Sequence, residues 1–163
     1  MKAPANKDSV VARYIEGPTL LERALKDLKE VDLDTASTKS GWSIRQIVHH
    51  IVDGDDIWKI GIKQALGNDR SEFSLDWYHA FPQDTWADRW AYSQRSVDVS
   101  LSLFKVIRDH VVQLLEHVPD GWNKSVGFRE PNGEIEIVPV GFVIEMQANH
   151  VMHHLQQIKT ILR

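Results

Sequence analysis

The sequence predicts an all-α fold, namely a four-helix bundle with a small β-hairpin before the last helix. Four segments carry apolar residues at helical spacing, turn-forming stretches separate them, and one short segment alternates around an Asn-Gly turn. No repeat, low-complexity tract or linker divides the 163 residues, which are enough to bury a sizeable core. We therefore expect a single domain over residues 1–163.

The limits of the first two helices are marked differently. Apolar residues recur over residues 9–29, although Gly17 and Pro18 are expected to kink or restart this helix. The second helix begins after Ser43, where a capping box pairs the serine with Gln46, and it continues to about residue 66. The sequence thus predicts a defined start for the second helix and an interrupted course for the first.

Three further features follow the second helix. Residues 67–84 combine a glycine and a proline with aromatic side chains, so we expect an irregular connection that lines or caps the opening of a site. A third helix is predicted over residues 85–117, where a Pro-Asp-Gly turn ends it. Alternation over residues 125–138 predicts the hairpin, and a last helix follows over residues 140–162.

The composition argues against several classes of protein. The 19 basic and 23 acidic residues are intermixed and leave a net charge of −4, so no basic stripe favours binding to nucleic acid. The N-terminal segment has no apolar signal core, and no stretch approaches the roughly 18 apolar residues that span a bilayer. We expect a cytoplasmic protein that binds neither nucleic acid nor membrane.

His50, His150 and His154 form the strongest candidate site. On the last helix, His150 and His154 are four residues apart and lie on one face, with His154 close to the apolar direction. On the second helix, His50 lies at the edge of the apolar stripe, whereas His49 points nearly opposite to it. His153 points outward from the last helix. Three inward imidazoles from two helices predict a divalent metal site.

The metal prediction has an alternative in the same residues. A chain with 8 histidines places some of them four residues apart by chance, and a buried imidazole is usually a hydrogen-bonded core residue. In that case the three histidines would be structural and would hold no ion.

The ligand chemistry limits which ion could bind. The chain has no cysteine, which excludes disulfides, thiolate ligands, iron–sulfur clusters and a cysteine nucleophile. Zinc and nickel suit all-nitrogen ligation, and iron or manganese would suit the site if carboxylate or water completed the ligand set. We expect zinc or nickel.

Asp53 is the candidate catalytic residue beside this site. It lies three residues after His50, close enough on the helix surface to orient the imidazole or to accept a proton. Gln157 lies three residues after His154 and could form a hydrogen bond that supports it. A solvated position is the alternative for both side chains.

Other polar and aromatic residues have weaker assignments. Asp55 and Asp56 form an acidic step on the second helix, which we expect to be a solvated face without a role. His79, in the aromatic connection, could approach the opening of the site. The 6 tryptophans are expected to fill the core or a dimer interface.

The order of the predicted elements and the two histidine segments resemble the DinB-like family of four-helix-bundle, metal-binding proteins. The resemblance spans nearly the whole chain. Its most specific residues are Gly41, Trp42 and Ser43 leading to His50 and Asp53, together with His150, His153, His154 and Gln157. By position, it implies one metal ligand from the second helix, His50, and two from the last, His150 and His154. It also implies a homodimer, and its characterised members include S-transferases and isomerases that use low-molecular-weight thiols.

Two functional hypotheses follow. In the first, the protein is a metal-dependent enzyme, a thiol S-transferase or a hydrolase, whose ion activates a thiol or water for attack on a small-molecule substrate. A low-molecular-weight thiol is one candidate substrate. In the second, the protein is a non-catalytic homodimer of the same fold that serves in binding or in a stress response.

Overall fold

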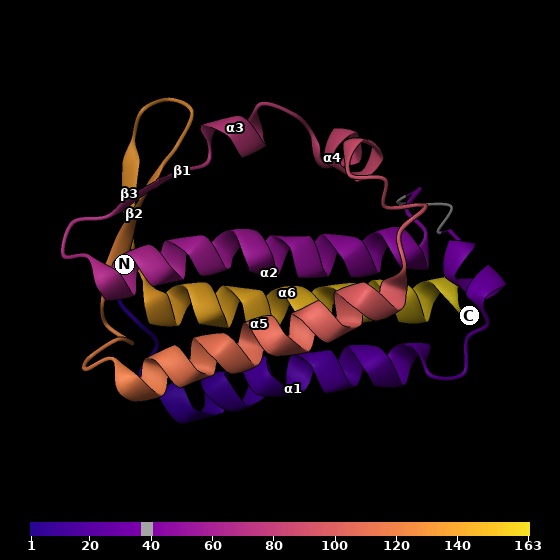
Figure 1. Ribbon diagram of the computed structural model, residues 1–163, viewed down its shortest axis with the longest axis horizontal. Helices are drawn as coiled ribbons and strands as arrows, with labels where there is room; N and C mark the ends of the chain where they lie inside the picture. The colour runs from indigo at the N-terminus through magenta and orange to yellow at the C-terminus, as the bar shows by residue number, and fades with distance from the viewer. Residues whose placement is uncertain (37–40) are drawn as a thin grey trace.

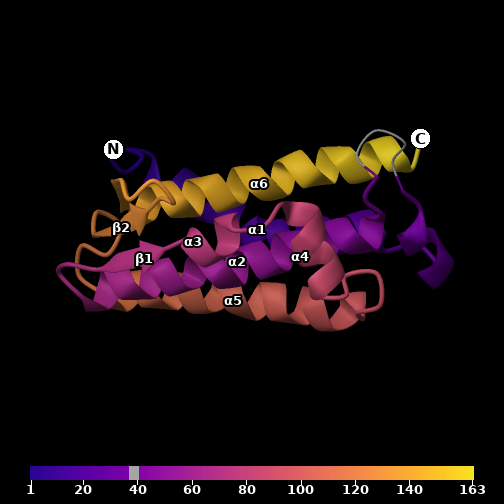
Figure 2. The ribbon, with the colours of Figure 1, turned by 90° about the horizontal axis from the view of Figure 1, so that it is seen from above.

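A computed structural model describes residues 1–36 and 41–163 of the chain, and it is a four-helix bundle with a small sheet at one end (Figure 1). The two termini lie at opposite ends of the bundle in both views (Figures 1 and 2). The long helices are α1 (Lys7–Leu25), α2 (Ile44–Gly67), α5 (Val97–His117) and α6 (Val140–Ile161). The shorter elements are η1 (Glu30–Asp34), β1 (Glu72–Ser74), α3 (Asp76–His79), α4 (Gln83–Arg89), β2 (Ser125–Arg129) and β3 (Ile135–Pro139). Within the described residues, no helix combines the length and the apolar character that crossing a membrane requires.

The first helix, α1, is continuous through Gly17 and Pro18, so the predicted restart was wrong. Pro18 has no N–H to bond to the carbonyl of Tyr14 one turn earlier. That carbonyl instead accepts a hydrogen bond of 2.6 Å from Nη1 of Arg108 on α5. Gly17 is required at this crossing, because a Cβ there would lie 2.3 Å from the same nitrogen. A contact from another helix therefore replaces the bond that proline removes.

The start of α2 confirms the predicted capping box. The amide of Gln46 donates to Oγ of Ser43 over 3.3 Å, and the amide of Ser43 donates to Oε1 of Gln46 over 2.9 Å. These two bonds satisfy backbone donors that the first helical turn leaves without partners. The helix begins at Ile44 because the cap stops it from extending further back.

The predicted third helix is interrupted. In place of one helix over residues 85–117, the chain forms α4 and α5, and the link between them turns at Ala91, whose φ of 52° is left-handed. Figure 1 shows α3 and α4 over α2, on the side away from α1. The expected irregular connection also contains more regular structure than predicted, since β1 adds to the sheet. Apolar spacing alone did not reveal this break, because short helices packed on the bundle have the same periodicity.

The predicted hairpin is confirmed. Strands β2 and β3 are antiparallel with Gly127 opposite Ile137, and Gly133 in their turn has a φ of +84°. Strand β1 pairs with β2 in parallel, with Phe73 opposite Phe128. Parallel pairing joins residues far apart in sequence, so no local turn signal announces it.

Arg108 lies between the two apolar clusters of the bundle and bonds to all three other long helices. Its ring neighbours are Tyr14, 4.2 Å from the guanidinium carbon, and Phe104, at 4.4 Å. Its Nε donates to Asp55 of α2 over 2.7 Å, and Nη2 donates to the carbonyl of Gln147 of α6 over 3.1 Å. The side chains of Arg108 and Asp55 are each 1% exposed.

This ion pair corrects the expectation for Asp55. We expected Asp55 and Asp56 on a solvated face, but only Asp56 lies there, beside Lys59. One helical step of about 100° separates the two aspartates, and it turns Asp55 into the core. A buried carboxylate needs a partner, and the sequence gives no local sign of one because Arg108 lies 53 residues away.

We predict that Asp55→Asn lowers the free energy of unfolding by about 3–5 kcal/mol, because it leaves the Arg108 charge buried without its counter-ion. The neighbouring Asp56→Asn serves as the matched control and should change it by at most about 1 kcal/mol, since its pair with Lys59 is solvated. Urea unfolding monitored by circular dichroism measures both. Equal effects of the two substitutions would contradict the structural role of the buried pair.

Candidate metal centre

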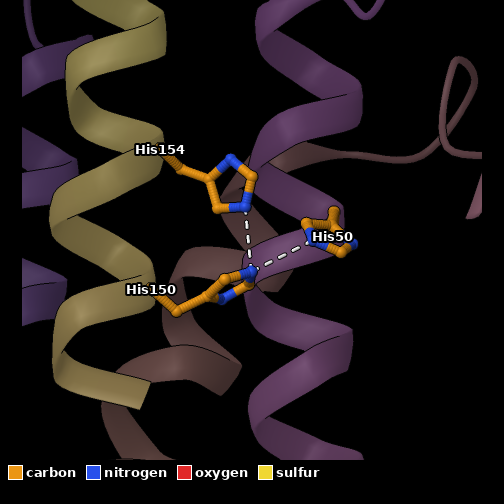
Figure 3. Close-up of side chains that lie close together, drawn as sticks. All are labelled: His50, His150 and His154. Carbon is orange, nitrogen blue, oxygen red and sulfur yellow. Dashed lines mark hydrogen bonds between the residues drawn. The ribbon is translucent and has the colours of Figure 1, made fainter. Parts of the chain in front are cut away.

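The three candidate histidines converge at one point between α2 and α6. His50 comes from α2, His150 and His154 come from α6, and their rings point toward one another (Figure 3). Nε2 of His150 lies 3.1 Å from Nε2 of His50 and 2.9 Å from Nε2 of His154. One ring nitrogen from each residue lies within 4.8 Å of the other two. The structure thus brings together the three residues that helical spacing selected.

Gln157 orients the ring of His154. Its Oε1 accepts a hydrogen bond of 2.7 Å from Nδ1 of His154, and its Nε2 donates to Nε2 of the exposed His153 over 3.2 Å. Because Nδ1 of His154 carries the proton, the lone pair is on Nε2, which faces the centre of the cluster. This is the supporting contact expected for Gln157, and it leaves His153 pointing outward as predicted.

The arrangement of the three ring nitrogens suits cation binding better than hydrogen bonding among the histidines. A neutral imidazole nitrogen either donates or accepts, and Nε2 of His154 is an acceptor. Nε2 of His150 cannot satisfy both of its close neighbours in one protonation state, so one contact between nitrogens would be repulsive. A cation that accepts all three lone pairs removes this conflict. Bonds of 2.0–2.1 Å in a tetrahedron place nitrogens about 3.3 Å apart, close to the observed spacings.

The surroundings of the cluster keep its imidazoles neutral. Burial, with repulsion from His154, lowers the pKa of His50 to about 4. Burial and the neighbouring histidines lower the pKa of His150 to about 3. Burial also lowers the pKa of His154, against the opposing hydrogen bond to Gln157. At neutral pH each of these rings is therefore uncharged and has one nitrogen lone pair that an ion can bind.

His49 corrects one detail of the helical-face prediction. It does not join the cluster, as expected, but it is fully buried instead of pointing away from the core. Its Nε2 donates to the carbonyl of Arg95 over 3.2 Å, and its Nδ1 lies 2.8 Å from Oγ of Ser100 on α5. Helix α2 is thus covered on two sides, by α6 near His50 and by α5 near His49. A single apolar stripe underestimates the burial of such a helix.

Asp53 belongs to a polar group beside His50. Its two carboxylate oxygens bind the two terminal nitrogens of Arg95 at 2.6 and 3.1 Å. Arg95 lies in the link between α4 and α5, and its guanidinium carbon lies 5.5 Å from the ring centroid of Tyr92. Burial and the Asp53 carboxylate raise the pKa of Tyr92, so its phenol keeps its proton. The sequence did not indicate Arg95 or Tyr92, because both reach the site through a turn that local spacing does not reveal.

Aromatic rings border the site on the side of the aromatic connection, residues 67–84. The ring of Trp42 meets that of His50 edge-on with centroids 5.1 Å apart, and its Nε1 donates to Asp84 in the first turn of α4. Trp86 of α4 stacks on Trp90, with centroids 4.8 Å apart. His79 is turned away toward the hairpin, where its Nδ1 lies 3.5 Å from Glu130. The aromatic connection therefore lies beside the metal centre, but His79 is not part of it.

Comparisons with known proteins agree with this architecture. A relative from Bacillus cereus (strain AH820) is 30% identical over 156 residues, which cover 94% of this chain and 84% of that protein. A relative from Oceanobacillus iheyensis is 26% identical over 147 residues, covering 90% of this chain and 80% of that protein. Both are provisionally named metal-dependent hydrolases.

A solved structure is also similar over nearly the whole chain. YfiT from Bacillus subtilis, described as a probable metal-dependent hydrolase with an unusual four-helix bundle topology, matches with a TM-score of 0.82. The match has 22% sequence identity and covers 99% of this chain and 88% of that one. A sequence model described as the DinB superfamily matches residues 13–158, a range that includes all three clustered histidines. The chain therefore belongs to the DinB superfamily.

Proposed function

We propose that the protein is a metal-dependent hydrolase that holds a divalent ion through His50, His150 and His154. The observation that carries this proposal is the convergence of one ring nitrogen from each of three histidines, with the ring of His154 oriented by Gln157. The provisional names of the relatives support the same reaction class. Zinc or nickel suits the all-nitrogen set, and iron or manganese would need further oxygen ligands.

The chemistry of the site follows from its ligand count. Three neutral imidazoles would hold the ion without neutralising its charge, and the bound ion would supply a Lewis acid that makes water or a thiol a nucleophile near neutral pH. The imidazoles hold that geometry because Gln157 orients His154 and the edge of Trp42 packs on His50.

Asp53 is the proton acceptor in this proposal. It lies one helical turn from His50, and the two bonds from Arg95 hold its carboxylate in one orientation. Arg95 is a positioning residue, since it acts through Asp53. A general base held in this way contributes about 10²- to 10⁴-fold to the rate of proton-transfer steps.

Thiol transfer is the competing reaction at the same centre. A thiol would occupy the open position of the ion in place of water, and the ion would stabilise the thiolate. The chain has no cysteine to supply that thiol, so the reaction would need an external low-molecular-weight thiol and an acceptor. A substrate panel therefore has to contain both hydrolysable compounds and pairs of thiol and acceptor.

We predict that His154→Ala and His50→Ala abolish stoichiometric metal binding, whereas His153→Ala retains it. The neighbouring His153 is the matched control, because its side chain is exposed and lies outside the cluster. Elemental analysis of tag-free, reconstituted protein measures the ion, with circular dichroism to confirm the helical fold. Equal loss of metal from His153→Ala and His154→Ala would contradict the assigned ligand set.

We further predict that Asp53→Asn lowers kcat by about 10²- to 10⁴-fold without loss of metal, because it removes the proton acceptor. Asp56→Asn, on the solvated side of the same helix, should leave kcat unchanged. Turnover of esters, amides and thiol–acceptor pairs by metal-loaded protein provides the measurement. A loaded protein that turns over none of them would favour the non-catalytic binding hypothesis.

The lowered histidine pKa values also predict a pH dependence. Below pH 6.5, His50 and His150 bind protons in the unfolded chain but remain neutral in the folded protein. The free energy of unfolding of the metal-free protein should therefore fall between about pH 6.5 and pH 4. Substitution of His150 by glutamine should flatten this slope, while substitution of the exposed His110 should not. Urea unfolding of chelator-treated protein across this range measures the slopes. Identical slopes for wild type and His150→Gln would refute the explanation.

A further inference from the structure

A second potential binding site lies between the sheet and the end of the bundle. A cavity of about 90 Å³ is bounded by apolar side chains of α2, α6 and β2, among them Trp58, Met146, Phe142 and Phe128. The ring of Trp58 meets that of Phe128 edge-on with centroids 4.8 Å apart, which gives the cavity a rigid aromatic wall. An apolar cavity of this kind beside a candidate metal centre suits part of a substrate.

Two rows of residues connect this cavity to the histidines. On α2, residues at four-residue steps are His50, Gly54 and Trp58; on α6, they are His154, His150, Met146 and Phe142. Residues four apart are neighbours on a helix surface and rise about 6 Å along its axis. Trp58 and Met146 of the cavity wall are therefore one turn beyond Gly54 and His150, which in turn adjoin His50 and His154.

Gly54 keeps the space between these two places clear. A Cβ at this position would meet only Cε1 of His150, at 3.9 Å, which is ordinary van der Waals contact. By contrast, a Cβ at Gly61 of the same helix would lie 3.2 Å from Phe128. Glycine is unfavourable inside a helix, and packing does not require it at residue 54 as it does at Gly17. The missing side chain leaves room for a ligand beside His150.

We propose that the cavity binds the distal end of an alkyl arm of the substrate, which passes over Gly54 so that the reacting group lies at His50, His150 and His154. This inference rests on the proposed function, because it assumes that the reaction takes place at the histidines. The cavity is smaller than the roughly 150 Å³ that holds a benzene ring, so it suits about three to five carbons at the end of the arm better than an aromatic ring.

The charge at the cavity selects among such arms. Glu130 and Glu136 line it, and no described residue of the lining is a lysine or arginine. Glu130 also lies 3.5 Å from Nδ1 of His79. Carboxylates at the rim repel an anionic group, so the arm is uncharged or ends in an amine. The proposed substrate class is thus an aliphatic compound with no negative charge at its distal end.

Methionine methyl groups allow a direct test that needs no turnover. The chain has 3 methionines: Met146 lines the cavity, while Met1 and Met152 are 60% and 49% exposed and serve as internal controls. Zinc-loaded protein with ¹³C-methyl methionine is titrated with alkyl hydroxamates of increasing chain length, whose head group binds the ion. Only the Met146 resonance should shift, and affinity should rise about three- to fourfold per methylene until the cavity is full.

Three substitutions, one of them a control, sharpen this test. Gly54→Leu should retain zinc and acetohydroxamate binding but lose the dependence on chain length, because its side chain fills the path. Gly67→Leu is the matched control at the end of the same helix, where a Cβ meets nothing within 4 Å. Trp58→Ala, away from the histidines, should weaken the longer hydroxamates selectively. Hydroxamates that end in a carboxylate should bind more weakly than those that end in an amine.

The outcomes separate this inference from the proposed function. If zinc binds and all hydroxamates have the same affinity while Met146 does not shift, the cavity assignment is overturned and the metal centre stands. If neither zinc nor nickel binds, the proposed function fails, and butylamine and hexylamine then test the cavity without an ion. A selective Met146 shift with these amines that Trp58→Ala abolishes would support the cavity as a binding site, and its absence would overturn it.

Discussion

The guanidinium of Arg108 on α5 bonds to each of the other three long helices, through the Tyr14 carbonyl of α1, the Asp55 carboxylate of α2 and the Gln147 carbonyl of α6. A buried charge is tolerated only when its bonds are geometrically satisfied, so the group restricts how these helices can slide or rotate. Gln147 precedes His150 by one turn on α6, and Asp55 follows His50 by five residues on α2. The register that Arg108 imposes therefore carries over to the histidines, which must meet within a few ångströms.

The convergence of the three histidines makes protonation of their imidazoles unfavourable. Three imidazoles in partly buried positions cannot readily accept protons, which lowers the pKa of His50 and His150 far below that of a free imidazole. The same property makes them ligands that an ion can use without displacing protons. Acid sensitivity of the metal-free protein and readiness for an ion are thus two consequences of one arrangement. Gln157 adds to it by fixing which nitrogen of His154 is free.

The bundle also places two chemically different regions along one pair of helices. At the histidines, α2 and α6 contribute nitrogen donors, with the Asp53–Arg95 pair beside them. Two turns from His50 and one turn from His150, the same helices contribute Trp58 and Met146 to an apolar cavity bordered by the sheet. A substrate with a polar reacting group and an alkyl arm matches this division. The hairpin would then act on specificity through Phe128, whose ring meets that of Trp58.

Local sequence patterns determined the helices α2 and α6, the capping box at Ser43, the hairpin turn at Gly133 and the choice of His50, His150 and His154. Each depends on residues close together in the chain, where spacing of about 100° per residue or a two-residue turn sets the geometry. Tertiary structure alone decided that α1 continues through Pro18, that α4 and α5 separate at Ala91, and that His49 and Asp55 are buried. In the case of Pro18, His49 and Asp55, the deciding partner lies on another helix or link, and burial depends on which surfaces pack together rather than on any periodicity within one segment.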